Sequence, residues 1–328
     1  MIIEVKKNLI NIIKEIHFEI VSEINKCITK NYNPKIVSDN NHIVGDVSYD
    51  IDVKAEAIVL KKIEKISKNI SITLVMEGLG KKEILNENNE YFATIIVDPI
   101  DGTREIMYNK RSAWILTGIA FTKNPEIKDI DIAIQTEIPT TKQNIFSYLY
   151  ALKGEGAFEE IYDKNTFECL QVKKKLSSSR AKILNDGYIC FPNPFPGPKV
   201  SIANTYERFY KNIFPTSNIN DAKVFSDEYV STGGQIYLLA TGCYRIVADI
   251  REFAQKEKNS LCCHPYDLCT VLIVIESGCE IMNLEGKELD YPLDTKTNCN
   301  WVGFANKELK QKYEKYLFES IFMNLLRN

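Results

Sequence analysis

The chain has 328 residues, of which 45% are hydrophobic and 26% are charged, and its formal net charge is -3. This length exceeds the usual range of a single domain, so we expect two domains that share an interface. The hydrophobic and charged fractions are ordinary for a globular protein. The slightly negative charge argues against a broad surface for a nucleic-acid polymer.

The sequence gives no sign of a membrane segment. No apolar run reaches the roughly 18 residues that a membrane-spanning helix needs. The N-terminus carries charges throughout and lacks the apolar core of a signal peptide. We therefore expect a cytoplasmic protein that does not enter a membrane.

The cysteines do not indicate a disulfide-stabilised protein. Their number, nine, is odd, and their spacing resembles no disulfide framework. The densest group consists of Cys262, Cys263, His264 and Cys269. A zinc site there is the less favoured interpretation, because adjacent cysteines are poor ligands for one tetrahedral ion. Buried free thiols in a reducing cytosol are the favoured interpretation.

Helices and strands alternate along the first half of the chain. Isoleucines at three- and four-residue steps over 10–24 predict an amphipathic helix, and helical spacing recurs up to residue 66. Apolar runs then predict strands, and Gly154 and Gly156 predict the turn of a hairpin. The predicted strands and the hairpin lie at 70–76, 94–98, 112–122, 129–138 and 147–162.

The second half follows the polar, basic segment VKKKLSSSR, and we place a domain boundary at about residue 175. Ser231 is expected to open one helix, and an acid, Asp267, to begin another. The mixture of helices and strands in both halves indicates a layered α/β fold. The predicted elements are a strand at the start of 181–191, helices over 201–214 and 231–242, a strand over 244–250 and a helix that ends near Gly278.

Residues 94–103, TIIVDPIDGT, carry the strongest chemical signal. The β-branched run predicts a strand buried on both faces. Pro99 should end this strand at Asp98, because proline has no N–H for the ladder. The carboxylates of Asp98 and Asp101 would then stand at the rigid end of a strand, although an Asp-rich turn is the plain alternative.

Other carboxylates stand at the edges of predicted elements. Glu77 ends the preceding strand, Asp267 begins a late helix and Asp52 precedes an early one. A surface acid or a helix cap would explain each of them alone, but neighbouring strands would bring Glu77 and Asp98 together. Crowded carboxylates raise each other's pKa, and a hard divalent cation such as Mg²⁺ relieves their repulsion.

Gly102 and Thr103 add an anion site to this cluster. Glycine permits a backbone geometry that other residues resist, and N–H groups at a turn or helix start bind anions. An anion site beside carboxylate-held metal is the layout expected for phosphoryl chemistry. Two metal ions about 4 Å apart can activate water on one side and stabilise the leaving oxygen on the other.

The motif VDPIDGT at 97–103, with MEG at 76–78 before it and PYDLC…ESG at 265–278 after it, resembles the inositol monophosphatase superfamily. These metal-dependent, lithium-sensitive phosphatases include inositol monophosphatases, bisphosphate nucleotidases and related sugar bisphosphatases. The resemblance implies an α/β fold of the αβαβα sandwich type. It implies an N-terminal α+β domain, 1–175, with an antiparallel sheet and the metal motif, and a C-terminal α/β domain, 176–328, with a mixed sheet, Asp267 and substrate contacts.

The resemblance also implies roles for the residues at the matching positions. Glu77 and Thr103 would orient the attacking water, and Asp52 would support that network. Two or more Mg²⁺ ions are implied, while Gly78, where the family has a second acid, leaves a third ion open. The implied metal ligands are Glu77, Asp98, the Ile100 carbonyl, Asp101 and Asp267. The implied substrate-binding residues are Gly102, Thr103, Ser231, Thr232 and Asp249.

The expected function is hydrolysis of a small phosphorylated polyol or sugar by metal-activated water. Lys110 and Arg111 could hold a second phosphate, with a solvated turn as the alternative. A 3′(2′),5′-bisphosphate nucleotidase is the second candidate, and its base would need an aromatic platform. Tyr206, Phe209 and Tyr210 could supply it.

Two further interpretations stay open at this point. In dehalogenase-type phosphatases the two aspartates are two residues apart, whereas here they are three apart with Pro99 between them, which disfavours that class. A catalytically silent phospholigand-binding relative is the other, since a fold and motif alone do not prove activity. The expected partner is a small phosphorylated metabolite, with neither a nucleic-acid polymer nor a membrane, and a homodimer is compatible with the resemblance.

Overall fold

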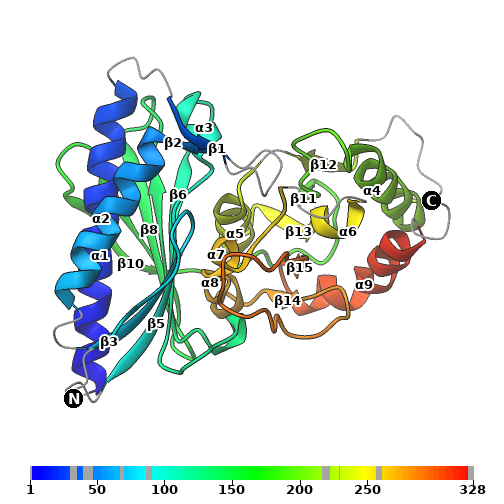
Figure 1. The fold of residues 1–328 in the computed structure, drawn as a ribbon. Coiled ribbons are helices and arrows are strands. Elements are labelled where there is room, and N and C mark those ends of the chain that lie inside the picture. The colour runs from blue at the N-terminus through cyan, green and yellow to red at the C-terminus, as the bar shows by residue number, and fades with distance from the viewer. Residues whose placement is uncertain are drawn as a thin grey trace.

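The computed structural model describes residues 2–29, 35–39, 47–66, 70–85, 91–215, 222–228, 230–255 and 261–323. These residues form five layers in the order helix, sheet, helix, sheet, helix (Figure 1). The predicted αβαβα sandwich is confirmed.

The larger sheet has eight strands in the order β10-β9-β8-β7-β6-β5-β3-β4. Neighbours run antiparallel except β3 and β5, which run parallel, so the expected antiparallel sheet contains one parallel pair. The reason is the hairpin of β3 with β4, after which the chain returns on the other side of β3. The strands are β3 (Ser71–Met76), β4 (Gly80–Ile84), β5 (Phe92–Asp101), β6 (Ala113–Ala120), β7 (Ile132–Ile138), β8 (Ile145–Leu152), β9 (Gly156–Asp163) and β10 (Cys169–Lys175).

Strand β5 continues past Pro99 to Asp101, so the predicted strand end at Asp98 is wrong. The register between β5 and β6 shifts at this point: β5 advances from Asp98 to Asp101 while β6 advances by only two residues. This bulge leaves Pro99 outside the ladder, where its missing N–H does no harm. The Ile100 N–H donates instead to Oδ1 of Asp98, at 3.0 Å.

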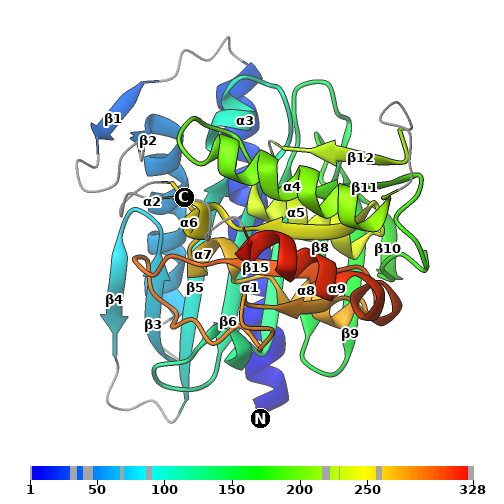
Figure 2. The same cartoon turned by 90° about the vertical axis from the view of Figure 1, so that its right-hand side faces the viewer.

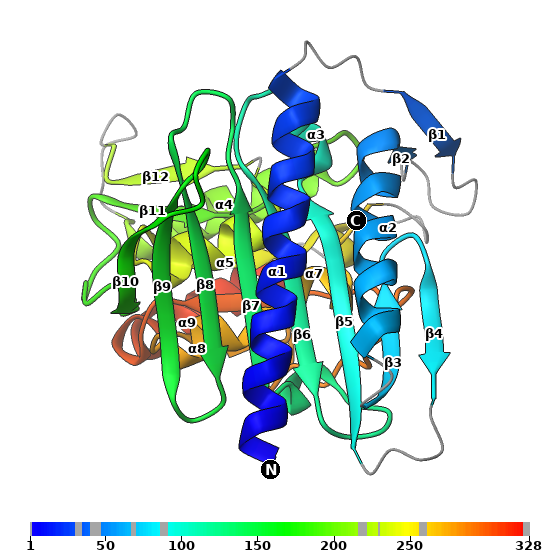
Figure 3. The ribbon, with the colours of Figure 1, turned by 90° about the vertical axis from the view of Figure 1, so that its left-hand side faces the viewer.

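Helices α1 (Ile2–Thr29) and α2 (Asp50–Ile66) cover the outer face of the larger sheet, as Figure 3 shows. The predicted stripe of isoleucines on α1 faces the sheet, and its four later members are buried. Burying such a stripe is the main source of stability for an amphipathic surface helix. These four residues are Ile13, Ile16, Ile20 and Ile24.

The smaller sheet has five strands in the order β12-β11-β13-β15-β14, with parallel and antiparallel pairs, as expected for a mixed sheet. The predicted strand start at 181 is wrong, because the strand begins at Gly187, after a turn in which the Gly187 N–H donates to the Leu184 carbonyl. The strands are β11 (Gly187–Cys190), β12 (Val224–Asp227), β13 (Tyr244–Asp249), β14 (Glu280–Met282) and β15 (Trp301–Phe304).

Three short helices fill the layer between the sheets, and three others lie on the far side of the smaller sheet (Figure 2). Ser231 caps α5 by accepting the Gly234 N–H, as predicted. The inner helices are α5 (Thr232–Ala240), α7 (Pro265–Leu268) and α8 (Leu272–Glu276), and the outer ones are α4 (Lys199–Ile213), α6 (Arg251–Ala254) and α9 (Lys307–Phe322). The remaining elements are β1 (Ile36–Asp39), β2 (Val47–Tyr49), α3 (Thr103–Met107) and η1 (Ile127–Asp129).

The single helix predicted from Asp267 to Gly278 is two helices, α7 and α8. Between them the Val271 N–H donates to the Leu268 carbonyl, three residues back, which tightens the chain into a turn. The Thr270 hydroxyl donates to Gln135 of β7 at 2.9 Å and so fixes this turn to the larger sheet.

An apolar core lies between the two sheets and takes side chains from both halves of the chain, including Leu116 and Ile246. A second core lies between the larger sheet and helices α1 and α2. The larger sheet ends at Lys175 and the smaller one begins at Gly187. The division into domains at about residue 175 stays a prediction, since the shared core joins the two sheets.

Candidate functional site

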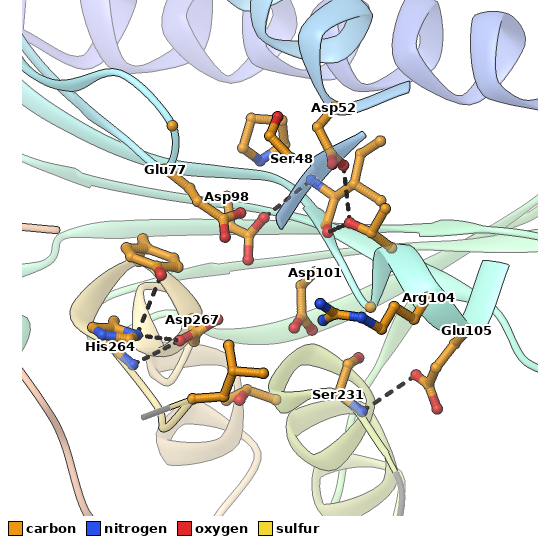
Figure 4. Close-up of a pocket in the computed structure, with 18 of the residues that line it drawn as sticks. Ser48, Asp52, Glu77, Asp98, Asp101, Arg104, Glu105, Ser231, His264 and Asp267 are labelled. Atoms are coloured by element: carbon orange, nitrogen blue, oxygen red, sulfur yellow. Dashed lines mark hydrogen bonds and ion pairs between the residues drawn. The ribbon is translucent and has the colours of Figure 1, made fainter. Parts of the chain in front are cut away.

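A pocket of about 500 Å³ opens between the larger sheet and the inner helices, close to the bulge of β5. Its walls come from both halves of the chain (Figure 4). All of the residues to which the family resemblance assigns a role, except Asp249, line it. These are Asp52, Glu77, Asp98, Ile100, Asp101, Gly102, Thr103, Ser231, Thr232 and Asp267.

The parallel pairing of β3 and β5 brings Glu77 and Asp98 together. Met76 is in register with Val97, and the Glu77 N–H donates to the Val97 carbonyl at 3.2 Å. The next residue on each strand therefore points into the same space, as Figure 4 shows. Burial, followed by repulsion from Glu77, raises the pKa of Asp98 well above its usual range.

Asp267 enters the cluster from the opposite side, on the first turn of α7. Its Oδ2 accepts the His264 N–H at 2.6 Å, which closes a capping box at the helix start. Pro265 is favoured at this first helical position, because the N–H that it lacks would have no partner there. The Tyr266 hydroxyl lies 3.2 Å from Nδ1 of His264. His264 is therefore held through its backbone N–H by Asp267 and through its ring by Tyr266.

The N-terminus of α5 holds Asp101. The Gly233 N–H donates to Oδ2 of Asp101 at 2.6 Å. Burial and the nearby carboxylate of Asp267 raise the pKa of Asp101 to about 8, while hydrogen bonds from Ser231 and Gly233 act in the opposite direction. The helix dipole also favours a negative charge at this position.

Asp98, Asp101 and Asp267 each offer a carboxylate oxygen, and these atoms lie within 4.8 Å of one another. Two of these side chains are buried, and burial, followed by repulsion between the carboxylates, raises their pKa values. Hard oxygen ligands in this number suit Mg²⁺ better than a softer metal ion. The residues present therefore fit a divalent cation. Among the residues that the structure describes, no other group of three or more potential metal ligands comes this close together.

The Thr103 hydroxyl lies next to this cluster. It is 2.9 Å from Oδ1 of Asp52 and 2.9 Å from the Ile100 carbonyl. The other carboxylate oxygen of Asp52 accepts the Tyr49 N–H at 2.8 Å, so its position is fixed from both sides. Gly102 has a φ of 93°, a left-handed conformation that lets the chain turn from β5 into α3.

The nine cysteines, all within the described ranges, are free thiols. Burial, the largest cause, raises the pKa of Cys262 to about 12 and that of Cys263 well above its usual range. Zinc needs thiolates, so the carboxylate cluster is the better metal site.

A family model described as the inositol monophosphatase family matches residues 11–319, nearly the whole chain. The chain belongs to the inositol monophosphatase family. This confirms the resemblance found in the sequence. Members of this family are metal-dependent phosphatases that hydrolyse phosphoric monoesters, so the chain is a phosphatase of this class, and small phosphorylated molecules are its substrates.

Solved structures share the fold over almost their full lengths. Fructose-1,6-bisphosphatase of Leishmania major in its holo form has a TM-score of 0.69 and 16% identity, covering 94% of this chain and 93% of that one. The extragenic suppressor protein SuhB of Bartonella henselae has a TM-score of 0.64 and 17% identity, covering 94% and 98%. An inositol monophosphatase–fructose 1,6-bisphosphatase has a TM-score of 0.65 and 19% identity, covering 94% and 98%. These identities show the fold alone. No curated protein matches the chain significantly.

In this family member, several residues chosen from the sequence lie away from the pocket. Asp249 is fully buried and binds Arg251. Arg111 binds Asp227 at 2.9 Å, and neither it nor Lys110 lines the pocket. The three aromatic residues proposed as a base platform do not line it either. These are Phe209, which is buried in the core, and Tyr206 and Tyr210, which pack against that core.

The sequence reasoning missed four charged residues that line the pocket: Glu56, Arg104, Glu105 and Arg251. Burial is the main cause that raises the pKa of Glu56 and that of Glu105 to about 7. Two of these residues could have been predicted, because they lie close to residues that the sequence analysis had already assigned to the site. Glu56 is one helical turn beyond Asp52, and Arg104 directly follows the DPIDGT motif.

None of the helices within the described ranges is long and apolar enough to cross a membrane.

Proposed function

We propose that the chain is a Mg²⁺-dependent phosphomonoesterase that hydrolyses a small phosphorylated polyol or sugar. The observation that carries this proposal is the carboxylate cluster of Asp98, Asp101 and Asp267, two of them buried, beside the Thr103–Asp52 hydrogen bond. Two or more Mg²⁺ ions would bind there. Their ligands would be Glu77, Asp98, the Ile100 carbonyl, Asp101 and Asp267.

When bound, the ions supply Lewis-acid activation of water and neutralise charge on the phosphoryl oxygens. The protein's own contribution is to place and deprotonate the attacking water. A Thr103 hydroxyl that donates to Asp52 keeps its lone pairs available to accept a hydrogen bond from this water. Asp52 can then take up a proton through Thr103, and Glu77 orients the water from the other side.

The rest of the pocket suits a hydroxyl-rich substrate. Ser231 and Thr232 bring hydroxyl groups to the pocket lining at the start of α5, and Glu56 and Glu105 bring carboxylates outside the metal cluster. Carboxylates accept hydrogen bonds from the hydroxyls of a polyol or sugar. This supports the polyol or sugar as the leading substrate class.

A nucleotide is the second candidate, because the aromatic residues that line the pocket include Tyr49 and Phe195. An aromatic face supports a stacked base and keeps it out of water. The predicted platform of Tyr206, Phe209 and Tyr210 lies elsewhere, so a bisphosphate nucleotidase would use these two residues instead.

A phosphate-release panel in Mg²⁺ tests the proposal. It contains inositol phosphates, fructose 1,6-bisphosphate and adenosine 3′,5′-bisphosphate, each repeated in excess chelator. We expect turnover of at least one sugar or polyol phosphate and none in chelator. Preference for the nucleotide would favour the second candidate, and no turnover of any member would favour a catalytically silent relative.

The proposed mechanism has no covalent intermediate. Hydrolysis in ¹⁸O-water under single turnover should place the label in the released phosphate. Label found in a carboxylate of Asp98 would instead show attack by the protein, as in dehalogenase-type phosphatases.

We further propose that this phosphatase acts in the cytoplasm and forms a homodimer. Nine free cysteines support the first part, because thiols persist in a reducing compartment. Sedimentation analysis at micromolar concentration would test the second part, and a monomer at all concentrations would contradict it.

A further inference from the structure

Asp249 and Arg251 form an ion pair at the end of β13. The carboxylate of Asp249 is 0% exposed and accepts two short hydrogen bonds from one guanidinium group. Nε of Arg251 donates to Oδ1 at 2.8 Å, and Nη2 donates to Oδ2 at 2.7 Å. Two parallel bonds of this kind fix the plane of a guanidinium as well as its position.

Arg251 faces the pocket, whereas Asp249 does not. Arg251 lines the pocket together with Leu261, Cys262 and His264, and its side chain is 14% exposed. Two of its nitrogens are used by Asp249, and no hydrogen bond of Nη1 is found within the described ranges. The buried carboxylate thus holds a guanidinium that still has donors to offer to a ligand.

The pocket is otherwise acidic. Its lining contains two basic side chains within the described ranges, those of Arg104 and Arg251. Arg104 directly follows Thr103 and lies over the ring of Tyr49, 5.9 Å from its centroid, on the α3 side. Arg251 lies on the side of the smaller sheet. The acidic lining residues are Asp52, Glu56, Glu77, Asp98, Asp101, Glu105 and Asp267.

These positions suggest two separate anion sites in one pocket. A phosphoryl group that reacts at the carboxylate cluster depends on metal ions for its charge balance, as proposed above. A second anionic group on the same molecule would need a cation on another wall, and Arg251 supplies one with its orientation already fixed. A cavity of about 500 Å³ is large enough for a small metabolite with two phosphoryl groups.

We infer that Arg251 binds a second phosphoryl group of the substrate and that Asp249 is the positioning residue that orients Arg251. The inference rests on the proposed phosphatase function and narrows its substrate class to small bisphosphorylated molecules. It also gives Asp249 an indirect role, because a fully buried carboxylate that binds Arg251 does not reach substrate hydroxyls. A planar guanidinium suits this role better than an ammonium, because it can donate to two phosphate oxygens at once.

The test compares two matched pairs of substrates that differ by one phosphoryl group. They are fructose 1,6-bisphosphate with fructose 1-phosphate, and adenosine 3′,5′-bisphosphate with adenosine 3′-phosphate. We expect kcat/KM to favour the bisphosphate in at least one pair, and that pair identifies the sugar or the nucleotide scaffold. In Arg251→Lys the ratio of the two kcat/KM values should fall at least about 10-fold, chiefly through KM, because a charge-assisted hydrogen bond is lost.

Two further variants, a charge control and a double variant, distinguish loss of the proposed contact from a general loss of charge or stability. Lys110→Gln removes an exposed positive charge from outside the pocket and should leave the ratio unchanged. Arg251→Gln alone would leave Asp249 as an unpaired buried charge, which is strongly destabilising. The double variant Asp249→Asn/Arg251→Gln avoids that charge, and it should also lose the preference for the bisphosphate. A ratio that stays within about twofold of the wild-type value in both Arg251→Lys and the double variant would overturn the inference, given the size expected of such a bond.

Binding separates this inference from the proposed function. If the wild-type protein releases phosphate from none of the four compounds, the proposed function fails. The inference is then decided by thermal unfolding in Mg²⁺ with the same compounds. Stabilisation by a bisphosphate that exceeds that by its monophosphate, and that Arg251→Lys removes, would support it. A wild-type protein that neither turns over nor binds a bisphosphate better than its monophosphate would overturn it.

Discussion

The Thr103 hydroxyl lies 2.9 Å from Oδ1 of Asp52, although the two residues are 51 positions apart in the chain. The contact joins the start of α3, just after the β5 bulge, to the first turn of α2. Asp52 is held on its other side by the Tyr49 N–H. In the mechanism proposed above, a hydroxyl and a carboxylate fixed in this way form the route by which a proton leaves the attacking water.

Removal of either end of this route should slow turnover strongly. We expect Thr103→Ala and Asp52→Asn each to lower kcat by about 100-fold or more, the usual range for a positioned proton acceptor. The double variant should be little worse than the worse single one, because the two residues act as a unit. The measurement is kcat on the best substrate of the panel at saturating Mg²⁺.

Thr241→Ala is a suitable control for this pair. Its hydroxyl donates to the Tyr237 carbonyl at the end of α5, away from the pocket. It should leave kcat within about twofold of the wild-type value, since nothing in the proposed proton route involves it. Losses of Thr103 and Asp52 that multiply in the double variant would contradict a shared route.

Asp98→Asn should show that the acidic cluster destabilises the metal-free protein and binds Mg²⁺. In chelator the variant should unfold at a higher temperature than the wild-type protein, because it lacks one of the crowded carboxylates whose burial and repulsion raise the pKa of Asp98. In Mg²⁺ the order should reverse, with affinity for the ion lower by at least about 10-fold. Thermal unfolding with and without Mg²⁺ measures both.

The matched control is Asp186→Asn, which makes the same chemical change outside the pocket. It should shift the two unfolding temperatures equally, so that the stabilisation by Mg²⁺ is unchanged. An Asp98→Asn protein that gains as much from Mg²⁺ as the wild-type protein would exclude Asp98 from the metal site.

Much of this site was predictable because it depends on local chemistry. A β-branched run that ends in an acid predicts a carboxylate at a strand end, and two such neighbouring strands predict that Glu77 and Asp98 meet. The parallel register of β3 and β5 places these two residues side by side. The αβαβα layers followed from the mixture of elements and from the family motif.

What was missed depends on tertiary packing. Pro99 is tolerated within β5 because a bulge removes its position from the ladder, and a propensity rule does not foresee the compensating shift. Asp249 was chosen because it matches a family acid that contacts substrate hydroxyls, but its side chain is buried in the interior, and Arg251 reaches the pocket instead. Which of two neighbouring charged residues is buried depends on the layer packed behind the strand.

Gly233→Ala should weaken the site without any loss of a ligand. A Cβ at this position would lie 2.8 Å from Oδ2 of Asp101 and 2.8 Å from Cδ2 of Leu116, so the carboxylate must move. We expect affinity for Mg²⁺ to fall at least about 10-fold, as it does when groups that orient ligands are disturbed. Calorimetric titration with Mg²⁺ measures this.

Gly234→Ala provides the control on the same helix. Its Cβ would meet Cγ2 of Val230 at 2.7 Å, and none of its three nearest atoms belongs to a carboxylate, so the variant should lose stability while it keeps the affinity for Mg²⁺. Equal loss of affinity in the two variants would mean that α5 moves as a whole, and that the contact between Gly233 and Asp101 has no special role.

His17 should make the protein sensitive to acid through a group far from the pocket. It is fully buried between α1 and the larger sheet, with Nδ1 2.8 Å from the Thr136 hydroxyl and Nε2 2.9 Å from the Thr117 hydroxyl. Burial lowers its pKa from 6.5 to about 3, so the folded protein keeps the ring neutral at pH values where the unfolded chain takes up a proton. The free energy of unfolding is therefore unaffected by this residue above pH 6.5 and falls as the pH drops from there towards 3.

The size of the effect follows from about 1.4 kcal/mol for each pH unit below the pKa of the unfolded chain, or about 2 kcal/mol between pH 7 and pH 5. His17→Gln cannot titrate, and its free energy of unfolding should fall by about 2 kcal/mol less over the same interval. Urea unfolding of both proteins in chelator at the two pH values gives this difference, and the contributions of the carboxylates cancel because they are common to both. Parallel losses in the two proteins would show that His17 takes up its proton in the folded state as readily as in the unfolded chain.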